Sequence, residues 1–230
     1  MSSLAFAGIC ISAGYATIKE VEVTRINLSL GRKIAFLVDL HLHRIDDVKE
    51  EVLNVLAEEQ PDVVLVGGDT LDELTPNMDV VSKYISGLEA KEKFAVMGNH
   101  EYWSGNAQDF VRILKNNGFV ILKNTTAQTS FGKICGLDWR DDRRYPEHRV
   151  DGLVLVHDPN AALSISGAQL VLAGHTHGGV VIAGQPIYSN SIYVRGLYKL
   201  EDGKTLYVSR GLGQMFPLRF TSPLELVIID

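Results

Sequence analysis

The stretch Gln169-Leu170-Val171-Leu172-Ala173-Gly174-His175-Thr176-His177-Gly178-Gly179 joins a short apolar run to a pair of histidines flanked by glycines. The apolar run predicts a buried strand, and the histidines follow its end. Because residues i and i+2 of an extended chain point to the same side, His175 and His177 can face one pocket. The glycines leave room for a ligand to approach the backbone. The stretch therefore predicts a binding site at the end of a strand.

Four other apolar runs, each predicted to be a buried strand, also end in polar residues that can bind a ligand. They end at Asp39-Leu40-His41, at Gly68-Asp69, at Gly98-Asn99-His100-Glu101 and at His157-Asp158-Pro159.

Segments with the apolar spacing of helices lie between the strands of the first half: Asp46–Glu59, Pro76–Leu88 and Ala107–Asn117. Alternation of strands and helices with short connections favours right-handed crossovers and a parallel sheet. In such a sheet, ligands bind beyond the carboxyl ends of the strands, where these polar residues fall.

From Phe119 onward the pattern changes to short strands separated by turns, which we interpret as a second, mostly antiparallel sheet packed on the first. The expected strands are Val120–Leu122, Lys133–Leu137, Leu153–Val156, Gln169–Ala173, Ile192–Val194, Leu206–Val208 and Leu224–Ile229.

The composition is that of a globular chain: 230 residues, 46% hydrophobic and 22% charged, with a net charge of -6. This charge gives no electrostatic footprint for nucleic acid. Cys10 and Cys135 are far apart and form no metal-finger pattern, so we expect free thiols in an intracellular protein.

The N-terminal segment Leu4–Ala16 is apolar but shorter than the ~18–20 residues of a membrane span. No Lys or Arg precedes it, so it lacks the basic region of a signal peptide. We interpret it as a first strand or a short surface segment, with a remnant membrane anchor as the alternative. We therefore expect a cytoplasmic protein, with peripheral membrane association through this segment as the second reading.

The polar residues at the strand ends combine carboxylate, amide and imidazole donors. This mixture suits a borderline divalent metal such as Mn, Fe, Zn or Co better than Ca or Mg, which prefer oxygen ligands. Two metals need a bridging carboxylate, and Asp69 has the central position for it. The candidate ligands are Asp39, His41, Asp69, Asn99, His157, His175 and His177.

These blocks, in this order, resemble the pattern of the calcineurin-like metallophosphoesterases: Asp-x-His, Gly-Asp, Gly-Asn-His-Asp/Glu, a single His and Gly-His-x-His. The tail, with Tyr207–Gly213, is similar to the phosphodiesterases of the YkuE/YaeI type. Val38 and Val180 depart from residues that are common in these proteins, Ser and Gln respectively. Neither is a ligand in the pattern.

The resemblance implies a four-layer α/β/β/α sandwich that forms a single domain over residues 1–230, with residues 1–30 as an apolar segment and an edge strand. It assigns Asp39, His41 and His177 to one metal and Asn99, His157 and His175 to the other, with Asp69 bridging. It places His100 as the catalytic residue that assists the leaving group. The implied activity is hydrolysis of a phosphate ester, most often a diester, by in-line attack of a metal-bridging hydroxide.

Arg210 and Tyr102 are further candidates for substrate binding. Arg210 follows a strand and can bind a phosphate in bidentate fashion, with a surface ion pair as the alternative. Tyr102 follows His100 and lines the pocket or packs in the core. The expected substrate is a small-molecule or lipid-linked phosphate ester. The alternative functions are a catalytically silent protein-binding scaffold and a nucleotide-linked lipid pyrophosphatase.

Overall fold

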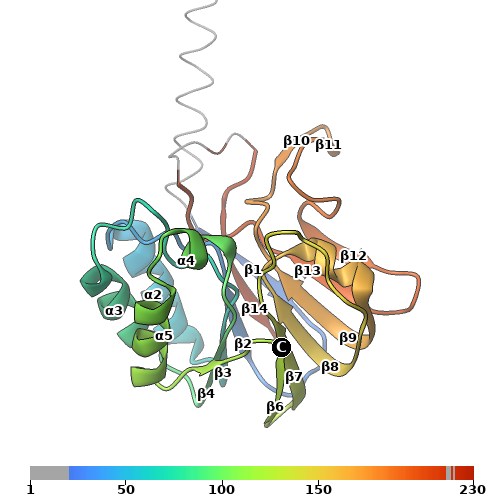
Figure 1. The fold of residues 1–230 in the computed structure, drawn as a ribbon, viewed down its shortest axis with the longest axis horizontal. Helices are drawn as coiled ribbons and strands as arrows, with labels where there is room; N and C mark the ends of the chain where they lie inside the picture. The colour runs from blue at the N-terminus through green and yellow to red at the C-terminus, as the bar shows by residue number, and fades with distance from the viewer. Residues whose placement is uncertain (1–20, 216–218, 220) are drawn as a thin grey trace, which may run out of the picture.

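The computed structural model describes residues 21–215, 219 and 221–230 of the chain. The apolar segment Leu4–Ala16 and Cys10 lie outside these residues. In the described part, two six-stranded sheets pack face to face, and helices cover the outer face of the first sheet (Figure 1). The predicted α/β fold with two mixed sheets and flanking helices is confirmed.

The first sheet has the strand order β1-β14-β2-β3-β4-β5. Its neighbouring strands are parallel, except that β14 is antiparallel to β2. The bounds are β1 Val21–Ile26, β2 Ile34–Leu37, β3 Val63–Val66, β4 Glu92–Ala95, β5 Val120–Ile121 and β14 Leu224–Ile229. Because β2, β3 and β4 run parallel, the residues that follow them meet at one edge of the sheet.

The helices begin and end where the sequence supplies caps. The side chain of Asp46 accepts a hydrogen bond from the backbone N–H of Lys49 at the start of α2, and Gln60 ends this helix with φ 48°. Asn77 caps α3 in the same way. The bounds are α2 Asp47–Glu59, α3 Met78–Ser86, α4 Asn99–Trp103 and α5 Ala107–Asn116.

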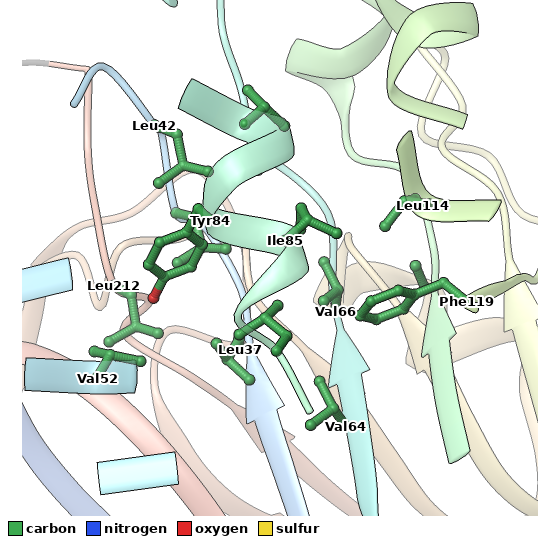
Figure 2. Close-up of a cluster of buried hydrophobic side chains, with 14 of the residues drawn as sticks. Leu37, Leu42, Val52, Val64, Val66, Tyr84, Ile85, Leu114, Phe119 and Leu212 are labelled. Carbon is green, nitrogen blue, oxygen red and sulfur yellow. The ribbon is translucent and has the colours of Figure 1, made fainter. Parts of the chain in front are cut away.

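The apolar faces of α2, α3 and α5 pack on the first sheet and form a buried cluster (Figure 2). In this cluster, Leu37 and Val66 of the sheet lie against Tyr84 and Ile85 of α3. The alternate residues of the same strands, such as Phe36 and Leu65, point to the other side and pack against the second sheet. Burial on both faces explains why these strands are continuous apolar runs.

The second sheet has the order β12-β13-β9-β8-β7-β6. The bounds are β6 Thr125–Thr129, β7 Gly132–Leu137, β8 His148–Val156, β9 Ile165–Ala173, β12 Gly196–Lys199 and β13 Thr205–Val208. A two-stranded hairpin, β10 Val180–Ile182 with β11 Gln185–Tyr188, stands apart from both sheets (Figure 1). On the outer face of this sheet, the described residues include one helical segment, the 3₁₀ helix η1 Pro159–Ser164, in place of a full helical layer.

The interpretation of the second sheet as mostly antiparallel is wrong. Strands β7, β8, β9 and β13 pair in parallel, and among the described residues of this sheet antiparallel pairs occur only at the two edges, β6–β7 and β12–β13. The short crossover through η1 resembles a hairpin connection in sequence, so alternation alone could not give the strand direction.

Three strand assignments also differ. Residues 192–194 form a loop between β11 of the hairpin and β12 of the second sheet. Strands β5 and β14 belong to the first sheet.

None of the helices in the described part of the chain is both long and apolar enough to cross a bilayer.

Candidate metal centre

The predicted ligands gather at the carboxyl edge of the sheets, where the backbone takes an unusual form. Asp39, His41, Asp69, His175 and His177 all have positive φ, between 45° and 71°. This left-handed region costs energy for residues other than glycine and recurs at functional sites. Hydrogen bonds between the loops hold it, since the N–H of Asp39 donates to the carbonyl of Gly68 at 3.0 Å, and the N–H of His41 to that of Asp69 at 3.1 Å.

The side chains form two adjoining groups. Asp39, His41 and His177 each offer a ligand atom, and these atoms all lie within 4.8 Å of one another; the same holds for Asp69, His157 and His175. The two histidines of the central motif therefore face different groups, and the expectation of an extended i, i+2 geometry is wrong because both residues are left-handed.

The two groups are in contact through the side chain of His157. Nε2 of His157 lies 2.9 Å from Oδ2 of Asp69 and 3.9 Å from Oδ1 of Asp39. Nδ1 of His175 lies 3.2 Å from the same His157 nitrogen. Within the first group, the rings of His41 and His177 lie 5.1 Å apart. Asp69 thus stands where a carboxylate could serve both groups.

Two buried polar atoms of this cluster have no hydrogen-bond partner among the described residues: Nε2 of His41 and Oδ1 of Asn99. A buried polar atom without a partner is costly, typically about 1–3 kcal/mol. A bound divalent cation would give both of these atoms a partner. Together with the carboxylate and imidazole donors around them, these atoms fit the pair of metals that the sequence predicts.

The electrostatics of the cluster favour positive charge at its centre. Burial raises the pKa of Asp39. Burial acts the same way on Asp69, but the charge and hydrogen bond of His157 outweigh it and hold the Asp69 pKa below its usual value. Burial lowers the pKa of His157, yet Asp69 overcomes this and raises it to about 10. Burial, then the charge of His157, lowers the pKa of His175 to about 3, leaving a neutral imidazole suited to a metal.

Hydrogen bonds at the far side of three rings set their orientation. Nδ1 of His41 lies 2.8 Å from Oδ2 of Asp72, Nδ1 of His157 lies 2.9 Å from the carbonyl of Gly67, and Nδ1 of His177 lies 3.1 Å from that of Gly213. Each ring can thus present Nε2 to a ligand. Asp72 falls in no strand-end motif and was not predicted from the sequence.

His100 lies beside the first group, with its ring 5.1 Å from that of His41. Its Nδ1 lies 2.6 Å from Oε2 of Glu73, and its backbone N–H donates to Oδ1 of Asp69 at 3.0 Å. Glu73 was not predicted from the sequence, in which its only signal is a position four residues after Asp69. The side chain of His100 is partly exposed, so substrate can reach it.

Glu101 ties the loops of the centre together. Its buried carboxylate accepts hydrogen bonds from the N–H groups of Gly98 at 2.7 Å, Asp69 at 2.9 Å and Thr70 at 2.6 Å. It therefore caps the start of α4 and fixes the loop after β3. Desolvation by burial and then the charge of Asp69 raise the pKa of Glu101 to about 7.

The two predicted substrate-binding side chains are engaged with acidic groups. Nη2 of Arg210 lies 2.7 Å from Glu22 and 3.1 Å from Glu225. The hydroxyl of Tyr102 donates to Asp138 at 2.5 Å. Both residues lie outside the two ligand groups, and a contact with substrate stays a prediction for each.

Comparison with known proteins agrees with this geometry. A model of the family "Calcineurin-like phosphoesterase" matches residues 32–179. An uncharacterized metallophosphoesterase of Aquifex aeolicus is 32% identical, over 91% of this chain and 88% of that protein. The phosphodiesterase YaeI of Escherichia coli is 30% identical, over 86% of this chain and 81% of YaeI. The chain spans 63% to 66% of the length of three other bacterial relatives.

The solved structure of a 5'-nucleotidase precursor from Thermus thermophilus matches with a TM-score of 0.53 and 14% identity, over 79% of this chain and 49% of that one. At this identity the match concerns the fold alone. The two sequence relatives confirm the resemblance that the motifs indicated.

Proposed function

This chain belongs to the calcineurin-like phosphoesterase family and is a metal-dependent hydrolase of phosphoric esters, and from that premise we propose that it is a phosphodiesterase with a dinuclear centre. The observation that carries the proposal is the pair of adjoining ligand groups. The similarity to the phosphodiesterase YaeI supports a diester over a monoester. Six of the seven predicted ligand side chains lie in the two groups, which favours an enzyme over the scaffold alternative.

In this proposal, Asp39, His41 and His177 would hold one cation, Asn99, His157 and His175 would hold the other, and the carboxylate of Asp69 would be available to both. When bound, the two cations neutralise the charge of the phosphoryl oxygens and lower the pKa of a water molecule toward about 7. Asp72 and the carbonyls of Gly67 and Gly213 keep the imidazoles oriented for this task.

The chain's own contribution to bond cleavage is His100. An ionised Glu73 can only accept, so Nδ1 of His100 carries a hydrogen toward it. In the imidazolium form of His100, Nε2 on the opposite side of the ring also carries a proton, and it gives this proton to the oxygen of the departing arm, which leaves a neutral imidazole. The leaving oxygen is thereby protonated or its charge stabilised, which is the role of a general acid.

The test is hydrolysis of bis-p-nitrophenyl phosphate and p-nitrophenyl phosphate by the whole protein after chelation and addition of Mn, Fe, Co or Zn. We expect turnover to return with at least one metal and the diester to be preferred. Absence of turnover with all four would overturn the proposal.

His100→Asn should lower kcat while metal analysis still finds two ions per chain. Asp69→Asn is the matched comparison, and we expect it to lose metal. If His100→Asn lost metal as well, the assignment of His100 as a residue that binds no metal would be wrong.

A further inference from the structure

Two tryptophans beside the proposed centre share one carboxylate oxygen. Nε1 of Trp103 donates to Oδ1 of Asp141 at 3.1 Å, and Nε1 of Trp139 donates to the same oxygen at 2.8 Å. The two indole rings are nearly perpendicular, at 89°, with centroids 6.3 Å apart. The single carboxylate of Asp141 thus sets the position of both rings.

The two rings differ in exposure. Trp139 is buried and packs against the imidazoles of His157 at 5.8 Å and His175 at 5.0 Å, so it forms part of the wall of the centre. Trp103, the last residue of α4, is 53% exposed. A large apolar ring left in water is unfavourable, and this one is also held in place by a hydrogen bond and a perpendicular ring contact.

Trp103 lies next to His100, the residue proposed to assist the leaving group. From the first ligand group outward, the rings follow in the order His41, His100 and Trp103, with centroid separations of 5.1 Å and 5.3 Å. An ester arm that leaves beside the His100 ring therefore departs next to the Trp103 ring, whose centroid lies 5.3 Å from that of His100. The acidic partner of the indole, Asp141, disfavours a further phosphate there and suits an uncharged ring.

We propose that the exposed indole of Trp103 is a stacking platform for a planar ring in the departing arm of the substrate. Fixed aromatic side chains stack nucleobases and similar rings with little loss of side-chain entropy. Such a platform favours esters with a heteroaromatic, nucleoside-like arm as the substrate class. It rests on the proposed function, which places the phosphate at the metal centre.

The experiment measures inhibition constants of AMP, phenyl phosphate and ribose 5-phosphate against bis-p-nitrophenyl phosphate hydrolysis by the metal-loaded protein. We expect AMP to bind at least about tenfold more tightly than ribose 5-phosphate, with phenyl phosphate between them. Trp103→Ala should remove this preference and leave the ribose 5-phosphate constant within about twofold. Trp103→Phe should retain part of it. Leu163→Ala, at a 65% exposed residue of η1, is the control and should change nothing.

A second readout does not depend on turnover: AMP should quench the tryptophan fluorescence of the wild type and fail to do so in Trp103→Ala. Equal inhibition constants for AMP and ribose 5-phosphate would contradict the assignment of Trp103 as a stacking platform. A preference for AMP that is unchanged in Trp103→Ala would contradict it as well. Equal constants for AMP and phenyl phosphate would overturn the nucleoside-like assignment. If the platform fails while the diester is still hydrolysed, the proposed function stands; if no metal restores hydrolysis, the proposed function itself fails.

Discussion

Nδ1 of His100 and Oε2 of Glu73 lie 2.6 Å apart, so the imidazole proposed to assist the leaving group is held by a carboxylate from the loop after β3. Glu73→Ala should lower kcat about tenfold to a hundredfold, with KM nearly unchanged, because the ring loses the partner that fixes its orientation. Steady-state kinetics on bis-p-nitrophenyl phosphate measure both constants.

Glu73→Gln is the matched control, since its amide oxygen can still accept from Nδ1, and it should keep more activity than Glu73→Ala. If both variants matched the wild type in kcat, the contact would have no part in orienting His100. A rise in KM alone would indicate a substrate-binding role instead.

The buried carboxylate of Glu101 should contribute to stability through the loops that it joins. Glu101→Gln places an NH2 group against the N–H donors of Gly98, Asp69 or Thr70, and we expect the free energy of unfolding to fall by about 2–3 kcal/mol. Urea denaturation measures this change.

The control for that experiment is Glu51→Gln, at an exposed position of α2, which should stay within about 0.5 kcal/mol of the wild type. Equal stabilities for Glu101→Gln and the wild type would show that the hydrogen bonds of Glu101 are replaced without cost.

The sequence predicted the strands and helices that are determined by the pattern of neighbouring residues. Val63–Val66, the apolar run before Gly68-Asp69, is buried on both faces, and the predicted helices Asp46–Glu59 and Ala107–Asn117 match α2 and α5 to within one residue at each end. The strand-end motifs likewise named residues that the structure gathers in two groups.

The rest depended on contacts between distant parts of the chain. Asp72 pairs with His41, 31 residues earlier, and Trp103 and Asp141 are 38 residues apart. No periodicity or turn signal marks such pairs. The direction of β8 and β9 was missed for a similar reason, since strands in either direction show the same alternation of side chains.

The ion pairs of Glu59 should give stability that depends on pH. The hydrogen bond from Arg25 and then that from Lys33 lower the pKa of Glu59 to about 2, from a usual 4.5. The group is charged and paired in the folded state, so its contribution is full above about pH 4.5 and is lost as the pH falls toward 2. Arg25 is half exposed, so we expect at most about 1 kcal/mol.

The measurement compares urea unfolding of the wild type and Glu59→Gln at pH 7, 4.5 and 3. The difference between them should shrink at the lowest pH and in 1 M NaCl. A difference that grows toward pH 3 would contradict the assignment.

The hydroxyl of Tyr84 is buried in the cluster of Figure 2 and has no hydrogen-bond partner among the described residues. Tyr84→Phe removes this desolvated group and keeps the ring, so we expect the free energy of unfolding to rise by about 1 kcal/mol. Thermal or urea unfolding measures it. A loss of more than 1 kcal/mol would mean that the hydroxyl has a partner.

The most direct test of the central claim is anomalous diffraction from crystals of the whole protein grown with excess Mn²⁺. We predict two strong peaks about 3.5–4 Å apart, one contacted by Asp39, His41 and His177 and the other by Asn99, His157 and His175, with Asp69 touching both. Absence of any peak among these side chains, at a manganese concentration that saturates activity, would contradict the account.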